Sequence, residues 1–477
     1  MKHTKIVATV GPSSESKDML RALADTGVNV FRLNFSHGEH SWHREVINRI
    51  REVSRELGVP IGILADLQGP RIRIDGESEE IPVAVGQKIR VSDVSRRDFL
   101  PKWGGATVYF DIPGISDALE VGHAVLIEDG TIRLRVTEQQ EGAVLAEVED
   151  EGLIRPRKGV NLPDSKLDLP ILSAKDKKDL RFVLEEGVDY VGLSFVGSAE
   201  DIGNAREAMR HFLPEDVPLP EVVSKIERKE AIRNLDSILK ETDAVMVARG
   251  DLGIEMPESE VVILQKDIIR RSLAALKPVI VATQMMKSMT ENPAPTRAEV
   301  SDVTNAVVDH ADAVMLSEET ATGKFPVETI ATMREIIERT EESPFDDLYQ
   351  TLDLNMRTEY AALIRGVYEL AKSFETKAIL LLSMSGFTAR LISHFRPEMG
   401  VLVATNERHT YDRLALLWGV TPYLFEGDMQ LDSFIDRMIA EAKEEGRLAP
   451  DDKTVVFLGR IPGQRDVQRL VGIREIR

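Results

Sequence analysis

The stretch DAVMVARGDLG at residues 243–253 joins a short apolar run to a charged turn that contains glycine. So short a run is typical of a strand that is buried on both faces rather than of a helix. The same arrangement recurs in EVVSKIE at 221–227 and DAVMLSEET at 312–320, with amphipathic helical patterns between the runs. Strands and helices that alternate in this way predict a parallel sheet covered by helices.

Eight runs of this kind occur, each followed by a helical pattern; the other five are KIVATVG at 5–11, VNVFRLNF at 28–35, IGILADLQ at 61–68, DYVGLSFV at 189–196 and KPVIVATQM at 277–285. Eight such units predict a closed (β/α)8 TIM barrel, with a doubly wound open sheet as the alternative. Polar residues at the carboxyl ends of the strands favour the barrel, because barrels build their sites there. These residues are Arg32, Asp66, Ser194, Lys225, Asp251, Thr283 and Ser317.

Two further regions interrupt and follow the barrel pattern. Residues 71–168 are rich in Gly, Val and acidic turns with period-two alternation, which predicts a small β-rich lid domain inserted into a catalytic barrel of residues 1–70 and 169–342. The stretch EESPFDDLYQTLDLNM at 341–356 has the broken periodicity of a linker. Residues 343–477 are expected to form a C-terminal α/β regulatory domain, with strands in TKAILLLSMSG, GVLVATN and KTVVFLG.

Composition limits the function. A chain of 477 residues is long enough for two or three domains, and a net charge of −20 argues against a general grip on nucleic acid or anionic membranes. No stretch reaches the length of a membrane span, so a soluble, cytoplasmic protein is expected. The chain has no cysteine, so a metal must rest on oxygen or imidazole ligands.

The clearest metal signal lies on two neighbouring predicted strands. Lys225 and Glu227 stand two residues apart, so their side chains share one face of a strand. Asp251 follows Gly250 at the next strand end. Two carboxylates with open positions suit Mg²⁺ or Mn²⁺. The alternative is that these acids merely pair with Lys225 and Arg249.

Cationic and hydroxyl residues surround this candidate metal. On the second predicted strand, Arg32, Asn34 and Ser36 stand two residues apart and share one face, so an anion-binding arginine lies beside two neutral oxygen ligands. Arg73 lies where the chain leaves the barrel. With Lys225 these two arginines supply the positive charge, and with Thr283 and Ser317 the hydroxyls, that phosphoryl transfer uses. Ordinary strand amphipathicity, and a Gly-Pro hinge for the insert, are the alternatives. No Walker-A or kinase glycine loop is present.

In order along the chain, TVGPSS, FRLNFSHG, DLQGPRIR, KGVNLP, SKIE, VARGDLG, ATQMM and LSEETA resemble the motifs of the pyruvate kinase family. The resemblance spans all three regions. It implies transfer of a phosphoryl group from phosphoenolpyruvate to ADP, giving pyruvate and ATP. It also implies a (β/α)8 barrel with a β-barrel lid, a C-terminal α/β domain and a homotetramer.

The resemblance assigns roles residue by residue. Glu227 and Asp251 would hold Mg²⁺. The substrate would contact the segment Ala248-Arg249-Gly250, Ser194 and Phe195. Arg32, Arg73 and Lys225 would hold the phosphoryl group, with Lys225 acting in the transition state, and Thr283 and Ser317 would assist protonation of the enolate. The expected nucleotide residues are Pro12, Asn34, His37, Arg73 and Lys158, although His37 also fits an ordinary surface histidine.

Three departures from the family pattern are informative. Many members hold K⁺ at the positions of Asn34, Ser36, Asp66 and the Leu67 carbonyl, with a Glu where this chain has Arg71. We therefore predict that Arg71 replaces the cation and that K⁺ is not required. Glu318 stands where Gly is usual, which leaves the role of Ser317 open, and His310 is interpreted as a helix-end residue.

In the third region, Ser383, Ser385, Gly386 and Thr388 form a loop that opens a helix, a suitable place for a phosphorylated effector. Ordinary helix capping is the alternative. Two other functions are weighed against the family's reaction. One is a metal-dependent lyase or mutase of the related barrels, and the other is an inactive sensor that binds a phosphometabolite.

Overall fold

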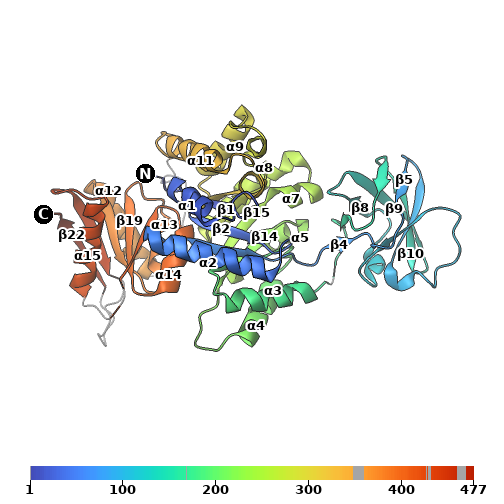
Figure 1. The fold of residues 1–477 in the computed structure, drawn as a ribbon, viewed down its shortest axis with the longest axis horizontal. Coiled ribbons are helices and arrows are strands. Elements are labelled where there is room, and N and C mark those ends of the chain that lie inside the picture. Colours follow the sequence, from blue (N-terminus) through green and yellow to red (C-terminus); the bar gives the residue numbers. More distant parts are fainter. Residues whose placement is uncertain (1, 168, 347–358, 426, 428–430, 459–468) are drawn as a thin grey trace.

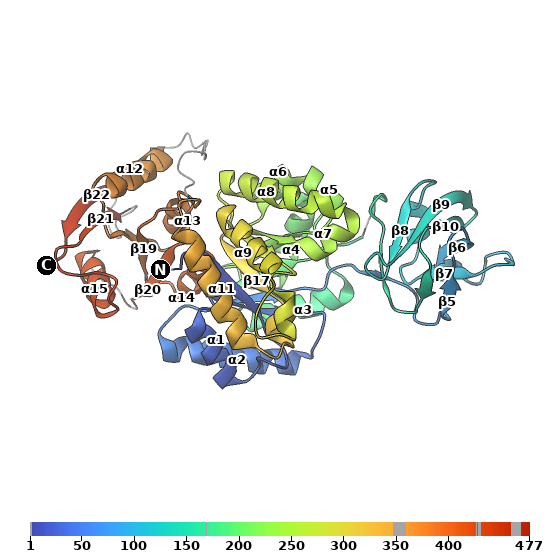
Figure 2. The same cartoon turned by 90° about the horizontal axis from the view of Figure 1, so that it is seen from above.

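The computed structural model describes residues 2–477 except 168, 347–358, 426, 428–430 and 459–468. Three parts follow one another along the long axis of the molecule (Figure 1). A barrel with its helices occupies the middle, a β-rich insert lies at one end, and a C-terminal α/β part lies at the other. The view from above shows the insert joined to the barrel by extended chain segments (Figure 2).

The barrel is a closed ring of eight parallel strands in the order β1-β17-β16-β15-β14-β13-β3-β2. Its strands are β1 (Lys5–Thr9), β2 (Val30–Asn34), β3 (Gly62–Asp66), β13 (Tyr190–Leu193), β14 (Glu221–Ile226), β15 (Ala244–Ala248), β16 (Val279–Ala282) and β17 (Ala313–Leu316). Each lies inside one of the eight predicted runs. The closed ring confirms the (β/α)8 prediction and excludes the doubly wound open sheet.

The outer layer consists of helices that pack their apolar sides on the strands. They are α1 (Lys17–Thr26), α2 (His40–Leu57), α3 (Ala174–Glu185), α4 (Ala199–Phe212), α5 (Lys229–Arg233), α6 (Leu235–Glu241), α7 (Arg249–Glu255), α8 (Glu258–Ala274), α9 (Arg297–Val308), α10 (Glu318–Ala321) and α11 (Pro326–Glu341), with the 3-10 turn η3 (Lys287–Thr290). Local sequence fixes where some of them begin. At α9, Thr296 and Glu299 form a capping box.

The strands are buried because they carry apolar residues on both faces. All five residues of β15 are buried, with one face toward the helices and one toward the barrel interior. The interior is filled by side chains such as Leu64, Tyr190, Met246 and Ile280. Ala415, which comes from the C-terminal part, belongs to the same cluster. The lower end of the barrel is therefore a packed core, and the open end is left for the site.

The insert is a β structure with its own core. Seven strands form a sheet in the order β4-β12-β8-β9-β10-β6-β7, and a bridge between Ile74 and Phe110 brings its two edges together. The strands are β4 (Ile72–Arg73), β6 (Lys88–Asp93), β7 (Thr107–Phe110), β8 (Ala124–Ile127), β9 (Ile132–Gln140), β10 (Ala143–Val148) and β12 (Gly159–Asn161), with β5 (Ile81–Val83) paired to β11 (Gly152–Ile154) and two 3-10 turns, η1 (Val94–Arg96) and η2 (Ile115–Ala118). This nearly closed sheet confirms a β-barrel-like insert.

The C-terminal part is a five-stranded sheet in the order β20-β19-β18-β21-β22. The predicted strands appear as β18 (Ala378–Leu382), β19 (Gly400–Thr405) and β21 (Lys453–Leu458), and the structure adds the edge strands β20 (Val420–Leu424) and β22 (Leu470–Glu475). The helices are α12 (Glu359–Ser373), α13 (Phe387–Ser393), α14 (Arg408–Arg413) and α15 (Leu431–Glu444), with the turn η4 (Leu414–Leu416). Most of the predicted linker at 341–356 lies outside the described residues.

Two ion pairs join the C-terminal part to the bottom of the barrel. Arg396 and Asp312 are 2.9 Å apart, with side chains 2% and 0% exposed, and the partly buried Arg390 contacts Glu221. Breaking the buried Arg396–Asp312 pair would leave an uncompensated charge. Among the described helices, none is both long and apolar enough to cross a membrane.

Candidate active site at the open end of the barrel

Four charged side chains meet at the carboxyl end of the barrel, from the ends of the adjacent strands β2 and β3 and of β14, which lies on the far side of β13. Lys225 Nζ lies 2.9 Å from Glu227 Oε1 and 3.2 Å from Asp66 Oδ1. The other carboxylate oxygen of Asp66, Oδ2, forms an ion pair with Arg32, whose Nε and Nη2 atoms lie 2.7 and 2.6 Å away. The acids are buried and the two cations are nearly so. The shared face predicted for Lys225 and Glu227 is confirmed.

Each charge in this cluster depends on its neighbours. Burial alone would lower the pKa of Lys225, but Asp66 and Glu227 outweigh it and raise that pKa above its usual value. Burial opposes ionisation of Asp66, yet Lys225 and Arg32 lower its pKa. Burial also raises the pKa of Glu227; Lys225 counteracts the rise, and Asp251 adds to it. Lys225 is therefore a fixed cation, and Glu227 gains from a cation nearby.

The loop after β13 supports the same cluster. Ser194 Oγ donates to the carbonyl of Leu67 at 2.7 Å and accepts from Lys225 Nζ at 2.8 Å. The backbone N–H of Phe195 donates to Glu227 Oε2 at 2.8 Å. Phe195 has a φ of 60°, a strained conformation for an aromatic residue. The hydrogen bond to Glu227 is one interaction that holds it there.

Asp251 projects from the first turn of α7 into the neighbouring cleft. Its side chain is 27% exposed, and its Oδ1 lies 3.5 Å from Arg71 Nη2. The Gly250 N–H donates to Thr283 Oγ1 at 2.8 Å, which ties α7 to the end of β16. The cleft has a volume of about 720 Å³ and includes Arg71, Gly250, Asp251, Thr283 and Ser317 in its lining.

Among the described residues, Arg249 forms its hydrogen bonds and ion pair with groups other than Glu227 and Asp251. Its Nη1 lies 2.7 Å from Asp302 Oδ1, and its Nη2 donates to the Thr283 carbonyl at 2.7 Å. In the alternative to a metal site, Glu227 and Asp251 merely form ion pairs with Lys225 and Arg249. In the described part of the chain, the structure shows only one of these pairs, between Glu227 and Lys225. Asp251 pairs with Arg71 from the insert side instead. Arg249 acts as a brace between the ends of β15 and β16.

The carboxylates fit a hard divalent cation. Among the described residues, Glu227 Oε1 is buried and receives no well-directed hydrogen bond, although the Lys225 ammonium is close. Asp251 has a single distant ion-pair contact in that part of the chain. No group of three or more His, Asp or Glu residues there forms a closed metal cage. Two acids with room for water and substrate oxygens are the donor set that Mg²⁺ prefers.

The two predicted hydroxyls lie at adjacent strand ends. Thr283 has a φ of 70° and donates from Oγ1 to the Ala282 carbonyl at 2.6 Å. The Ser317 N–H donates to Glu319 Oε2 at 2.7 Å, and Glu319, which is 2% exposed, also accepts from the Met286 N–H at 3.2 Å. Glu319 thus fixes the loops that carry both hydroxyls. Glu318 is exposed and lines the cleft.

The predicted nucleotide residues fall into two groups. Pro12 and His37 are exposed on the barrel, and Asn34 Oδ1 accepts from the Ser36 N–H at 3.1 Å. Arg73 and Lys158 belong to the insert: Arg73 Nη1 donates to the Arg157 carbonyl at 3.1 Å, and Lys158 Nζ pairs with Glu128 at 2.6 Å. Within the described chain, no hydrogen bond or ion pair joins the two groups.

The positions expected to hold a monovalent cation are partly engaged. The Leu67 carbonyl accepts from Ser194, Asp66 is held by Arg32 and Lys225, and Asn34 holds the Ser36 backbone. Arg71 lies beside Asp251 rather than in contact with these groups in the described part of the molecule.

The effector loop precedes a short helix. Ser383 is buried, Ser385 is exposed, and Gly386 has a φ of 76°. Thr388 shares a hydrogen bond with Tyr360, so its hydroxyl is engaged. No side chain caps α13 at Gly386.

Sequence reasoning missed two residues of the site. Thr9 accepts from Arg32 Nη1 at 3.0 Å through its hydroxyl, and buried Glu319 positions Ser317. Thr9 ends β1, so its place at a strand end is a usable signal. Glu319 gives no comparable signal, because its role depends on loops that meet only in the folded barrel.

The chain matches two family models and many full-length relatives. The model described as pyruvate kinase, barrel domain, matches residues 1–330, and the model described as pyruvate kinase, alpha/beta domain, matches residues 361–470. Pyruvate kinase from Agrobacterium vitis is 41% identical over 96% of this chain and 95% of its own length. The enzymes from Staphylococcus haemolyticus and Staphylococcus epidermidis RP62A are 39% and 37% identical, each over 99% of this chain and 80% of the relative. This chain belongs to the pyruvate kinase family.

Proposed function

We propose that the open end of the barrel transfers the phosphoryl group of phosphoenolpyruvate to ADP, with Lys225 stabilising the group in transit. Pyruvate kinase is the activity of the family, and the residue roles are inferred from the geometry. The observation that carries the proposal is the buried cluster of Arg32, Asp66, Lys225 and Glu227 beside a cleft that contains Asp251.

Lys225 and Arg32 supply the fixed positive charge. Both side chains belong to one buried cluster, and both form ion pairs with Asp66, which holds them in place. Phosphoryl transfer needs neutralisation of equatorial oxygens more than covalent help from the protein. Because Lys225 is charged at any working pH and is anchored on three sides, it contributes without reorganising.

Glu227 and Asp251 would hold the divalent cation. When bound, Mg²⁺ supplies positive charge beside the reacting oxygens. Phe195 and Lys225 orient Glu227, and the short helix α7 presents Asp251 to the cleft. The backbone of Ala248-Arg249-Gly250 would bind the substrate carboxylate, since Arg249 braces it against Asp302 and the Thr283 carbonyl. Ser194 and Phe195 complete that wall.

Protonation of the enolate is assigned to the hydroxyl side of the cleft. Thr283 and Ser317 line it together, and Glu319 fixes the Ser317 backbone. Neither hydroxyl is a strong acid alone, so ordered water would deliver the proton through them. Thr283 also accepts from the Gly250 N–H, which links the protonating side to the carboxylate-binding backbone.

Closure of the insert would complete the nucleotide site. Arg73 and Lys158 lie on the insert, whereas Pro12, Asn34 and His37 lie on the barrel. ADP between them would bring the two groups together and exclude water from the reaction. We also propose that Arg71 supplies the charge of the monovalent cation, as a fixed guanidinium next to Asp251.

Two surfaces support the homotetramer expected for the family. On α8, Ile263 is 68% exposed and lies outside the lining of the cleft. At the edge of the C-terminal sheet, β22 exposes Leu470, Val471 and Ile473. Apolar side chains and an unpaired strand edge are usually covered by a partner. The loop with Ser383, Ser385, Gly386 and Thr388 remains the proposed place for a phosphorylated effector.

The proposed function is tested with the wild-type chain, phosphoenolpyruvate, ADP and Mg²⁺. ATP and pyruvate should form in equal amounts, measured by separate coupled reactions. Release of pyruvate without ATP would favour a phosphatase or lyase, and the absence of both products would favour a sensor. A sample that binds Mn²⁺ but forms neither product would contradict the proposal without any doubt about its folding.

A further inference from the structure

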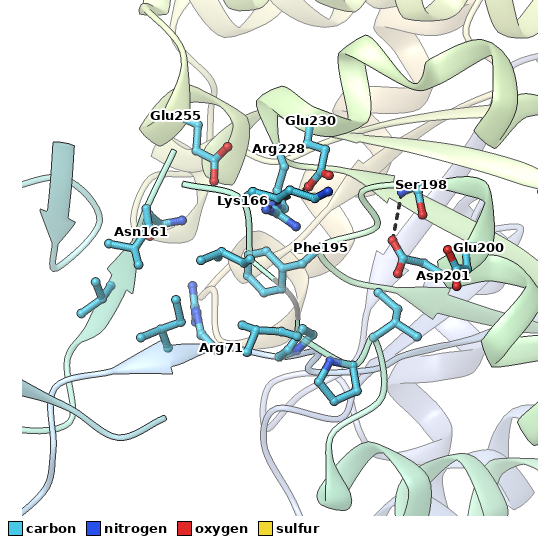
Figure 3. A pocket seen from close by; sticks show the side chains of 18 of the residues that line it. Arg71, Asn161, Lys166, Phe195, Ser198, Glu200, Asp201, Arg228, Glu230 and Glu255 are labelled. Atoms are coloured by element: carbon cyan, nitrogen blue, oxygen red, sulfur yellow. Dashed lines mark hydrogen bonds and ion pairs between the residues drawn. The ribbon is translucent and has the colours of Figure 1, made fainter. Parts of the chain in front are cut away.

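A second cavity lies beside the segments that connect the insert to the barrel. It has a volume of about 560 Å³ and is lined by residues 70–72 of the outgoing connection and by residues 160–162, 166, 167 and 169–171 of the returning one. The loops that follow β13 and β14 form its opposite wall (Figure 3). This size suits a small organic ligand.

Apolar side chains form one part of the largely polar lining of the cavity. The ring of Phe195 projects into it, with Arg71 on one side and Lys166 on another (Figure 3). Ile72, Leu162 and Leu167 supply aliphatic surface. Phe195 is only half-buried, and its backbone is held by Glu227. The cavity therefore offers an aromatic face whose position is fixed by a backbone hydrogen bond.

The acids that line the cavity are mostly engaged. Glu230 pairs with Arg228 at 3.1 Å, and Glu255 accepts from the Lys229 N–H at 2.9 Å. Asp201 caps α4 by accepting from the N–H groups of residues 197 and 198 at 2.8 and 2.9 Å. The remaining acid, Glu200, lies next to Asp201, on the side away from Arg71 and Lys166 (Figure 3).

Two of the three cations in the lining are weakly engaged, whereas the third, Arg228, pairs with Glu230. Lys166 is exposed and makes no hydrogen bond or ion pair within the described part of the chain. Arg71 is 36% exposed, and its ion-pair contact is the 3.5 Å approach to Asp251. Arg71 and Lys166 are therefore the cations left to a ligand at this side of the cavity, although acids outnumber cations in the lining as a whole.

We propose that this cavity binds a small organic anion with an apolar body. The apolar body of the ligand would pack on Phe195, Leu162 and Leu167. Its acidic group would lie between Arg71 and Lys166, because a guanidinium suits a carboxylate. None of the residues proposed to bind the nucleotide lines this cavity, nor does any hydroxyl proposed to act in protonation; Phe195 is the residue that it shares with the proposed substrate wall.

Two contacts connect the cavity to the proposed metal site. Arg71 lines both cavities and approaches Asp251, and the Phe195 backbone donates to Glu227. An anion that draws Arg71 away from Asp251 would change the affinity for the divalent cation, and by linkage the cation would change the affinity for the anion. The binding step itself does not depend on the proposed function, whereas the coupling does rest on it.

The test uses 4-(trifluoromethyl)benzoate as the probe, with fluorine NMR and calorimetry on the full chain. We expect saturable binding of one probe per chain, and binding about tenfold weaker for the neutral 4-(trifluoromethyl)benzamide. Lys166→Gln should weaken binding about threefold, since an exposed charge contributes modestly. Asn204→Trp, which fills the cavity from its exposed rim, should abolish binding. Lys177→Gln, an exposed lysine of α3 outside the cavity, should leave binding unchanged.

Saturating phosphoenolpyruvate separates this site from the cleft. Binding should persist in its presence, and the Kd for Mn²⁺ should shift at least twofold when the probe is bound. The proposal is overturned if the benzamide binds as well as the benzoate, if Asn204→Trp binds normally, or if phosphoenolpyruvate displaces the probe competitively. Probe binding without a shift in Mn²⁺ affinity would contradict the coupling. A wild-type chain that binds the probe but does not turn over phosphoenolpyruvate and ADP would instead count against the proposed function alone.

Discussion

The ammonium of Lys225 and the carboxylate of Glu227 lie 2.9 Å apart, two residues from each other along the chain. Asp66 approaches the same ammonium from β3, so one cation is shared by two buried acids. The arrangement keeps a positive charge next to a candidate metal ligand without letting the two groups neutralise each other completely. Under the proposed function, a divalent cation and a phosphoryl group would bind side by side there.

The two metal candidates should contribute unequally to metal affinity. Asp251→Asn and Glu227→Gln each remove a carboxylate charge, and we expect Mn²⁺ binding to weaken by about 10- to 100-fold or more, as losses around metal sites usually do. Glu227→Gln should have the larger effect, because Glu227 is buried and pre-oriented by Phe195. Calorimetric Mn²⁺ titrations measure both. Asp302→Asn, beside Arg249, is the control; equal affinity in all the proteins would exclude these acids as ligands.

Activity should not depend on K⁺. Arg71 places a fixed guanidinium 3.5 Å from Asp251, so the turnover rate in tetramethylammonium chloride should match that in KCl within about twofold. Arg71→Glu should lower the rate in tetramethylammonium and make it depend on KCl. Strong stimulation of the wild type by KCl would disprove the replacement, as would an Arg71→Glu protein that ignores both salts.

Acid should destabilise the junction between the barrel and the C-terminal part through His394. Burial lowers the pKa of His394 from 6.5 to about 4, with nearby arginines adding to the effect. The unfolded chain then binds a proton more readily than the folded one, so stability present above pH 6.5 is lost as the pH falls toward 4. Between pH 7 and 5 the loss is about 2 kcal/mol.

Urea unfolding of wild type and His394→Gln at both pH values measures this term. The stability difference between the two proteins should shrink by about 2 kcal/mol at pH 5. Asp189 works in the opposite direction, because burial raises its pKa to about 6 and its contribution is lost as the pH rises from 4 to 6. The contribution of Asp189 to the free energy of unfolding is the same in wild type and His394→Gln, so it cancels from the difference between them. His211→Gln, at an exposed position, should follow the wild type, and a difference that stays constant with pH would contradict the assignment.

Association should depend on α8. Wild type should show about four times the 53.2 kDa chain mass in light scattering, and Ile263→Asp should dissociate into smaller species because it buries a charge in an apolar contact. Val217→Asp changes an exposed valine away from α8 and should remain tetrameric. A monomeric wild type, or an Ile263→Asp protein of unchanged mass, would remove α8 from the interface.

Local patterns were sufficient for the barrel but not for every strand. The eight runs were recognisable because each is apolar on both faces, and β15 is buried throughout. The edge strands β20 and β22 were not predicted. Pro422 interrupts the first, and all six residues of the second are exposed, so it lacks the buried face that marks a strand in sequence. Their strand conformation depends on pairing with β19 and β21 rather than on their own sequence.

The candidate site was predictable where spacing along one strand decides geometry. Lys225 and Glu227 meet because a strand has a period of two. Arg249 was different: its partner Asp302 lies 53 positions away, so only the folded structure shows that it points away from Glu227. The approach of Arg71 to Asp251 likewise depends on how the insert leaves the barrel.

The most direct test of the account is the turnover rate of Lys225→Met in phosphoenolpyruvate, ADP and Mg²⁺, measured with Mn²⁺ affinity on the same sample. We expect kcat to fall at least about 1,000-fold, the scale of losing a charged transition-state contact, while Mn²⁺ still binds. Lys177→Met, at an exposed position on α3, should keep full activity. A Lys225→Met protein that keeps its metal and turns over within tenfold of wild type would contradict the role of Lys225.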